Sequence, residues 1–230
     1  MKKQLSVPMT RHETILGYGY LAFQLLVLPS LLQFVSNILP KPFTNAEINF
    51  LFFAINFIAT TVVFRKFLAE NGKRFLSDPG SVLLKSIYGF IGYWVISYTV
   101  GMAILQIYPD FYNVNDSAID AMVKENMALI SFGTTLLAPV AEELLYRGLI
   151  FRGFYNKKPL LGYLVSALAF ACIHVVGYVH QYEPIHLALC LVQYLPAGIC
   201  LAWAYAKTDN IFAPILMHIA INQIGIFTLR

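Results

Sequence analysis

Three charged residues interrupt an apolar stretch of the chain at a spacing that suits acid–base chemistry. Residues 129–154 read LISFGTTLLAPVAEELLYRGLIFRGF, and within them stand Glu142, Glu143 and Arg147. A charged side chain inside a membrane-spanning helix costs on the order of 3 kcal/mol on insertion scales, so such residues are retained for pairing or for function. A buried carboxylate can act as a general base that activates water. This segment is therefore the first candidate for a catalytic site.

The spacing makes the two carboxylates unequal. Glu143 and Arg147 are four residues apart with the acid first, which is the favourable order for an ion pair on one helix face. Glu142 is turned about 100° away on a helix of about 3.6 residues per turn, so we expect Arg147 to neutralise Glu143 and to leave Glu142 free. Another side-chain rotamer could reverse these roles, and the triplet alone also fits a structural salt bridge at a membrane interface.

Two histidines and an asparagine lie in later apolar segments. His174 stands in ALAFACIHVVGYV, and His218 stands in APILMHIAINQIG with Asn222 one turn further on. His218 and Asn222 are four residues apart, so their side chains can converge on one point. A single histidine in an apolar helix is usually a core residue bonded to a neighbouring helix. Polar groups on three separate apolar segments together indicate a catalytic or transport site inside a helix bundle.

The remaining ligand-type side chains give weaker signals. His180, Glu183 and His186 flank Pro184 in a short loop, where we expect them at the membrane interface, with an outward-facing metal site as the alternative. The three cysteines lie in apolar segments. An odd number of cysteines without CxxC spacing argues against a disulfide framework and against a thiolate metal site.

The composition is that of an integral membrane protein. Hydrophobic residues make up 58% of the chain and charged residues 12%, whereas soluble domains contain about 45–50% apolar and about 25% charged residues. The net charge of +4 comes without a dense basic cluster, so the sequence gives no sign of nucleic-acid binding. The expected surroundings are membrane lipids.

Seven apolar segments are close to the roughly 20 residues that a helix needs to cross a bilayer. Because strand alternation and repeats are lacking, they predict an all-α, polytopic transmembrane helix bundle in which residues 1–230 form a single membrane domain. The first segment exceeds the roughly 7–15 residues of a signal-peptide core, so we interpret it as a retained span. The fourth segment is either one long helix or two pieces broken at Pro139. The predicted segments are 15–39, 48–68, 82–108, one from about 127 that carries the charged triplet, 160–179, 185–206 and 211–229.

The loop charges predict an orientation. Most lysines and arginines fall in the N-terminal tail and in the loops that follow the second, fourth and sixth segments, whereas the loop after the third segment carries three aspartates. Basic loops remain on the cytoplasmic side of a membrane. We therefore expect a multi-pass protein with its N-terminus in the cytoplasm and its C-terminus outside.

Taken together, the three motifs resemble those of a known family. Glu142-Glu143-x-x-x-Arg147 resembles the EExxxR motif of the CAAX-protease and bacteriocin-processing family, also called CPBP or Abi. Phe170-x-x-x-His174 is similar to its FxxxH motif, and His218-x-x-x-Asn222 is similar to its HxxxN motif. The motifs stand in the family's order, each in an apolar segment, within a motif-bearing core at about residues 127–229.

The resemblance implies an intramembrane endopeptidase related to the type 2 CAAX prenyl protease, with a polar cavity among the C-terminal helices. Its substrate would be a lipidated or membrane-embedded peptide or protein. In the preferred scheme no cofactor is required: Glu142 and His174 activate a water molecule. His218 and Asn222 then donate hydrogen bonds to the tetrahedral oxyanion. Glu143 and Arg147 hold Glu142 in place, and Phe170 belongs to the supporting motif.

Three alternatives remain open. Within the same class, Glu142, His174 and His218 would bind zinc, with Glu143 as the base. We prefer the metal-free scheme because no HExxH sequence is present and because pairing with Arg147 weakens Glu143 as a base. A non-catalytic bacteriocin-immunity or signalling-partner protein would keep the polar core for structure alone. A transporter or proton relay would need polar residues that reach both membrane faces, and the outer halves of the segments are apolar.

Overall fold

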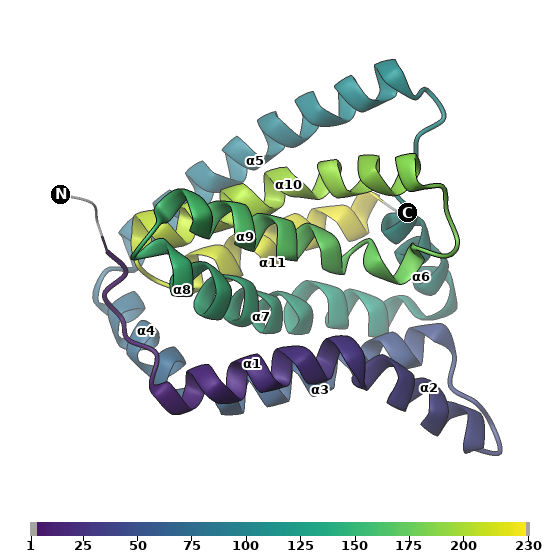
Figure 1. The fold of residues 1–230 in the computed structure, drawn as a ribbon, viewed down its shortest axis with the longest axis horizontal. Helices are drawn as coiled ribbons and strands as arrows, with labels where there is room; N and C mark the ends of the chain where they lie inside the picture. The colour runs from purple at the N-terminus through teal and green to yellow at the C-terminus, as the bar shows by residue number, and fades with distance from the viewer. Residues whose placement is uncertain (1–3, 229–230) are drawn as a thin grey trace.

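The computed structural model describes residues 4–228, and these residues form an all-α fold without strands (Figure 1). Two π-helical segments and one short 3₁₀ turn connect some of the α-helices. The π-helical segments are η1 (Gly133–Leu137) and η2 (Leu144–Phe151), and the 3₁₀ turn is η3 (Val176–Tyr178). The α-helices are α1 (Arg11–Leu26), α2 (Leu28–Ile38), α3 (Asn45–Val63), α4 (Arg65–Ser77), α5 (Pro79–Ile107), α6 (Val114–Phe132), α7 (Ala138–Glu143), α8 (Arg152–Tyr155), α9 (Pro159–Ile173), α10 (Pro184–Thr208) and α11 (Phe212–Thr228).

Among the described residues, four helices are long and apolar enough to cross a membrane. There are five such spans if a bent pair of helices counts as one. The four are α3, α5, the continuous helical path Val114–Tyr155 and α10, and the bent pair is α1 with α2, which meet at 49°. Seven spans, as the sequence predicted, are not shown. The predicted segment 160–179 fails as one span because α9 ends at Ile173 and the chain turns at His174. The predicted segment 211–229 contains the 17-residue helix α11, and its last residue lies outside the described part of the chain.

The segment with the charged triplet is one continuous helical path, so the predicted alternative of a break at Pro139 is wrong. Pro139 directly follows the π-helical segment η1, and local π-helical adjustments allow a proline to stay inside a membrane helix without breaking it. The kink is instead at Asn126, whose φ of −156° and ψ of 91° are not helical. The predicted start near residue 127 corresponds to this kink, and the helix extends back from it to Val114.

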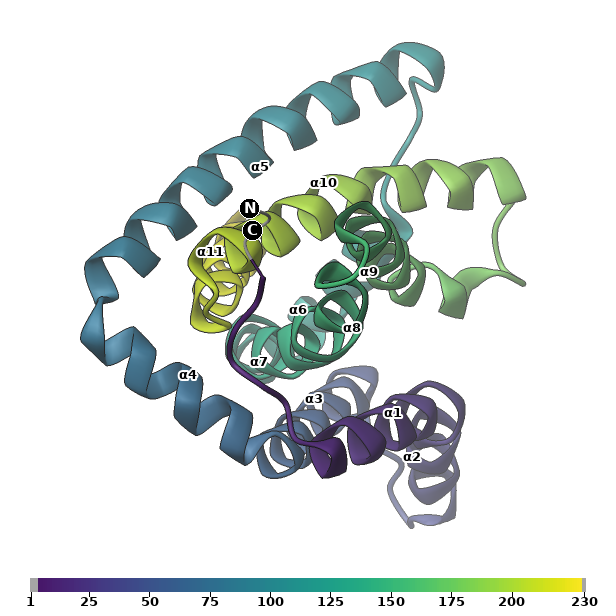
Figure 2. The same cartoon turned by 60° about the vertical axis from the view of Figure 1, so that its left-hand side comes forward.

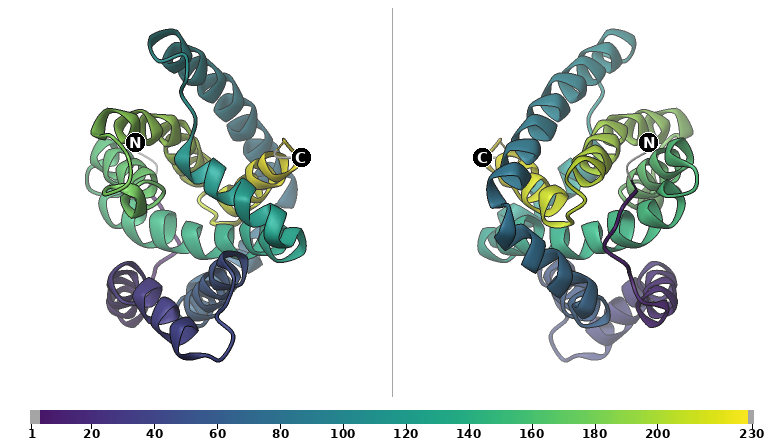
Figure 3. Two further views of the ribbon diagram at one scale, coloured as in Figure 1. Left: turned by 90° about the vertical axis from the view of Figure 1, so that its right-hand side faces the viewer. Right: turned by 90° about the vertical axis from the view of Figure 1, so that its left-hand side faces the viewer.

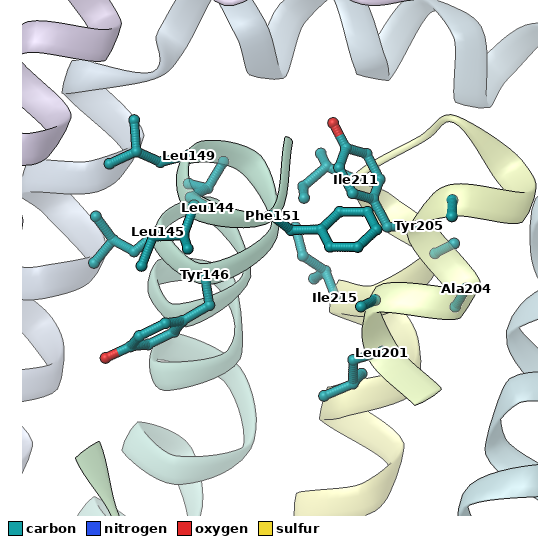
Figure 4. Close-up of a cluster of buried hydrophobic side chains, with 14 of the residues drawn as sticks. Leu144, Leu145, Tyr146, Leu149, Phe151, Leu201, Ala204, Tyr205, Ile211 and Ile215 are labelled. Atoms are coloured by element: carbon teal, nitrogen blue, oxygen red, sulfur yellow. The ribbon is translucent and has the colours of Figure 1, made fainter. Parts of the chain in front are cut away.

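The helices are arranged with the charged path in the middle of the bundle. Figure 3 shows α1, α2 and α3 on one side and α5 on the other. Helix α3 packs against α6 and α7, while α10 packs against α9, α5 and α11. Every residue of η2 is buried. Leu144, Phe151, Leu201 and Tyr205 belong to the buried cluster that joins η2 to α10 (Figure 4).

The segment before α1 runs across one end of the bundle (Figure 2) and fixes several elements together. The backbone N–H of Ser6 donates to both carboxylate oxygens of Asp209, and Arg74 forms an ion pair with the same carboxylate at 3.1 Å. Arg152 Nε donates to the carbonyl oxygen of Val7 at 2.9 Å. The N-terminal segment, α4, α8 and the turn between α10 and α11 therefore lie at the same end, as the charge pattern predicted.

Candidate active site

The ion pair at the centre of the site is the one that the helical spacing predicted. Arg147 Nη1 donates to Glu143 Oε1 at 2.8 Å, and both side chains are fully buried. A second guanidinium nitrogen, Nη2, donates to the carbonyl oxygen of Gly198 on α10 at 3.2 Å. Because a buried charge is costly unless it is paired and hydrogen-bonded, Arg147 joins η2 to α10 as well as neutralising Glu143.

His218 from α11 lies between the two glutamates. Its Nδ1 is 2.8 Å from Glu143 Oε1, and its Nε2 is 3.9 Å from Glu142 Oε2. A carboxylate can only accept a hydrogen bond, so the proton stands on Nδ1 and Nε2 is directed toward Glu142. The bond from Glu143 to His218 was not foreseen from the sequence, which assigned Glu143 to Arg147 alone.

Among the described residues Glu142 forms no ion pair with Arg147, and its nearest charged-group partner is His218 at 3.9 Å. Glu142 Oε2 is buried and has no hydrogen-bond partner among the described residues. Further buried polar atoms without a partner belong to its neighbours: Glu143 Oε2, Arg147 Nε, the Tyr146 hydroxyl and the Thr134 hydroxyl. Buried groups of this kind are normally satisfied by water or by a ligand.

Phe170 on α9 provides the apolar wall around which the charged and imidazole groups gather. The Arg147 guanidinium carbon lies 4.3 Å from the centre of the ring. The rings of His174 and His218 lie 4.7 Å and 5.6 Å from it, and the Tyr146 ring meets it edge-on at 5.8 Å. One phenylalanine therefore contacts both predicted histidines and the arginine.

His174 is held by its own helix and by a tyrosine of α10. Its Nδ1 lies 2.8 Å from the carbonyl oxygen of Phe170, which places the proton on Nδ1 and leaves the lone pair on Nε2. Its ring stacks on Tyr194 with centroids 4.3 Å apart. Within residues 4–228 no hydrogen bond or ion pair joins His174 to Glu142.

Asn222 is engaged by the backbone of η1. Its Nδ2 donates to the carbonyl oxygen of Thr134 at 2.9 Å, so one of the two N–H bonds of the carboxamide is already used. The other N–H is available for a further acceptor. His218 and Asn222 share a face of α11, as their spacing predicted, but each is bound to a different part of the central path.

Sequence reasoning missed Tyr194 and the polar group behind it. The Tyr194 hydroxyl lies 3.2 Å from both Asp116 Oδ1 and Asn113 Oδ1, which share its one hydrogen, and it accepts from Asn115 at 3.1 Å. The Asn113-Val114-Asn115-Asp116 run was visible as polar residues at a helix start. Its contact with a tyrosine about eighty residues further along the chain could not be read from it.

The side-chain positions bear on the zinc alternative. Among the residues that the structure describes, no three His, Cys, Asp or Glu side chains are close enough to hold one metal ion. Glu142 and His218 offer a carboxylate oxygen and an imidazole nitrogen of the kind that zinc accepts, but His174 would have to move to complete the set. Zinc binding by these three residues stays a prediction.

Comparison with known proteins agrees with the motifs. A family model described as "Type II CAAX prenyl endopeptidase Rce1-like" matches residues 124–224. These residues form a domain of that family. The Rce1-like domain begins within α6, ends within α11, and contains all seven predicted site residues.

Two curated relatives extend the comparison. The chain is 30% identical over 90 residues to the "UPF0177 protein YxdF" of Lactococcus lactis, an alignment that covers 39% of this chain and 44% of that protein. It is 26% identical over 175 residues to the "Putative membrane peptidase YdiL" of Bacillus subtilis, covering 73% of this chain and 67% of that protein. The match thus spans less than half of the first relative and about two thirds of the second. No solved structure matches the chain.

Proposed function

We propose that the protein is an intramembrane endopeptidase that hydrolyses a peptide bond in a lipidated or membrane-associated substrate. The observation that carries the proposal is the buried Glu142 Oε2, which has no hydrogen-bond partner among the described residues and lies 3.9 Å from His218 Nε2. Both lie in an Rce1-like domain. Groups separated by more than 3.5 Å in a buried polar site are often bridged by water, and a hydrolase needs such a water.

The proton positions suggest different roles for the two histidines, one as a proton acceptor and one as a hydrogen-bond donor. His174 donates through Nδ1 to a backbone carbonyl, so its Nε2 carries a lone pair and can take a proton from water together with Glu142. His218 donates through Nδ1 to the Glu143 carboxylate. In this scheme His218 is doubly protonated when it binds the oxyanion, so its Nε2 donates as well.

The oxyanion of the tetrahedral intermediate would then be bound by His218 Nε2 and by the N–H of Asn222 that Thr134 does not use. In this scheme Glu143 and Arg147 orient His218, which modifies the role that the sequence suggested for them. Attack of water on the peptide carbonyl forms the C–O bond, and its proton passes to Glu142 or His174. The same proton is returned to the leaving amine as the C–N bond breaks.

The test is a comparison of membrane peptidomes from cells that carry the wild type, Glu142→Gln or Glu70→Gln. Glu142→Gln keeps the side-chain shape and removes the base, so we expect turnover to fall by about 10²–10⁴-fold. Glu70 on α4 has a partly exposed side chain whose ion pair within the described residues is with Lys73, so its variant is the matched control. Identical peptidomes for wild type and Glu142→Gln, with both proteins inserted, would refute proteolysis at this site and favour a non-catalytic immunity or partner-binding protein.

The zinc scheme is tested on the same preparations. Purified protein is analysed for bound metal, and cleavage is measured before and after chelation. Stoichiometric zinc whose removal abolishes cleavage, and whose return restores it, would replace the metal-free scheme by one in which Glu142, His174 and His218 are ligands.

The orientation is part of the proposal. With the N-terminus in the cytoplasm, the end of the bundle that carries Arg74, Arg152 and Asp209 faces the cytoplasm. A reporter fused to the N-terminus tests the orientation, and an extracytoplasmic signal would contradict it.

A further inference from the structure

A pocket lies at the end of the bundle opposite the N-terminal segment. The linker 108–113 between α5 and α6 and the linker 174–183 between α9 and α10 lie at this end (Figure 1). Together with the start of α10 they line an open pocket of about 610 Å³. Volumes of about 300–1,000 Å³ are typical of small-molecule sites. Nothing in the catalytic motifs uses this pocket.

Aromatic rings form much of its wall. The ring of Tyr112 lies 4.8 Å from that of His186 and 6.4 Å from that of Tyr182, which it meets at 73°. Tyr182 and His186 stack at 5.8 Å. His186 is buried, and its Nε2 bonds to the carbonyl oxygen of Tyr112 at 2.9 Å. This bond ties the linker 108–113 to the start of α10, so this part of the aromatic wall is formed before any ligand binds.

The carboxylates that line the pocket are not balanced by a lysine or an arginine in the lining. Asp110 and Glu183 line the pocket, and no lysine or arginine does. Glu183 is the N-cap residue of α10 but makes no side-chain capping bond, so no hydrogen bond from the first turn of the helix occupies its carboxylate. Aromatic faces carry a negative quadrupole and attract cations. The carboxylates and the ring faces therefore both favour a cationic ligand.

An organic cation fits this lining better than a metal ion. The Nε2 of His186 is engaged by a backbone carbonyl, and the described residues contain no group of three His, Cys, Asp or Glu side chains that could hold a metal. The predicted alternative of a metal site at His180, Glu183 and His186 is thus not supported by their arrangement. Ring faces, in contrast, contact the methyl groups of an alkylated ammonium ion.

We propose that this pocket binds an organic ammonium group, either of a free small molecule or of a lipid headgroup. The pocket is separate from the catalytic cluster: His186 precedes Tyr194 by eight residues of α10, or about 12 Å along the helix. Tyr194 in turn stacks on His174. The proposal does not depend on proteolysis, since it rests on the pocket alone.

The test uses the full-length protein in nanodiscs of phosphatidylglycerol, titrated with choline chloride at constant ionic strength and followed by saturation-transfer NMR of the choline methyl groups. The uncharged isostere 3,3-dimethyl-1-butanol is titrated in parallel. Two variants remove one feature each: Glu183→Gln removes a charge, and Tyr182→Leu removes a ring. We expect each to weaken choline binding about three- to fivefold and to leave the binding of the isostere unchanged.

The control variants carry substitutions of the same type at positions outside the pocket. Glu70→Gln on α4 and Tyr98→Leu on α5 alter exposed side chains away from the pocket, and we expect choline binding as in the wild type. Far-ultraviolet circular dichroism and size-exclusion profiles establish that each variant folds. Equal affinity for choline and its isostere, or an unchanged choline affinity in both pocket variants, would overturn the proposal.

A second arm identifies the source of the ammonium group. The choline titration is repeated in nanodiscs that contain phosphatidylcholine. Loss of free choline binding in these discs means that the lipid headgroup occupies the pocket, and unchanged binding means that a free ammonium compound is its ligand. Absence of choline binding in phosphatidylglycerol discs would refute both.

Discussion

Helix α5 and the helical path Val114–Tyr155 have nearly the same mean hydropathy, 1.5 and 1.4, yet only 6% of the apolar window of α5 is buried in the protein, against 56% for the path. Ile91, Val95 and Tyr98 of α5 are more than half exposed, which suits a helix that faces lipid. The path carries Glu142, Glu143 and Arg147 in the middle of the bundle. Hydropathy thus identifies apolar helices, and only their packing shows which of them carry the residues of the candidate site.

The sharpest test of this contrast removes a charge from each region. In Arg147→Met the Glu143 carboxylate stays buried and keeps only His218 as a partner, so we expect the free energy of unfolding to fall by about 3–5 kcal/mol. Lys85→Met on α5 removes a half-buried lysine whose hydrogen bond, within residues 4–228, is to Ser81, and its effect should be much smaller. Denaturant titrations in detergent micelles measure both. Similar losses for the two variants would contradict the contrast.

The next largest effect is expected when one aromatic ring is truncated in each region. Phe170→Ala removes the wall that contacts Arg147, His174 and His218, and the cavity left behind should cost about 3 kcal/mol. Trp94→Ala on α5 truncates a partly exposed ring whose aromatic contacts are with neighbours on its own helix, so we expect a minor change. The same unfolding measurement applies. A larger loss for the tryptophan variant would mean that α5 is packed against protein and not against lipid.

Glycine substitutions probe the packing of backbones. A Cβ at Gly198 would lie 2.8 Å from the Cα of Ala167 on α9, so Gly198→Ala must separate α9 from α10, at a cost of about 1–3 kcal/mol. At Gly101 of α5 a Cβ meets nothing within 4 Å, and Gly101→Ala should be neutral or stabilise the helix by up to about 1 kcal/mol. Thermal unfolding of the two variants should therefore shift in different directions. A neutral Gly198→Ala would show that the two helices can separate freely.

The smallest expected effect concerns the polar contact of α5 with the core. Ser86 Oγ lies 3.2 Å from the carbonyl oxygen of Ala213 as well as 2.8 Å from that of Val82. An interhelical bond of this kind in a membrane contributes about 0.6 kcal/mol, so Ser86→Ala should lower stability by about that amount. Thr99→Ala removes an exposed hydroxyl that donates to the carbonyl oxygen of Val95 in the same helix and serves as the control. An unfolding free energy equal in both variants would mean that α5 gains nothing from this bond.

Local sequence relations predicted the parts of the site that lie on one helix. Glu143 and Arg147 are four residues apart, and helix geometry alone places them within reach of each other. The structure confirms that pair. The helical character of the chain and most helix positions were predictable for the same reason, since hydrophobic runs and helix ends are local signals.

The number of spans was not predictable in this way. An apolar run does not reveal where a helix stops, and the turn at His174 interrupts a run that reads as continuous. The kink at Asn126 and the unbroken path past Pro139 depend likewise on backbone geometry, which the neighbouring helices determine.

The sequence by itself determined which residues carry polar chemistry, that they lie in apolar helices, and which of them share a helical turn. Only the tertiary structure decided that His218 binds Glu143 across 75 positions of the chain, that Tyr194 stacks on His174, and that Asn222 bonds to Thr134. The physical reason is that contacts within a helix follow from its pitch. Contacts between helices depend instead on how whole surfaces pack, which is the sum of many small terms along both partners.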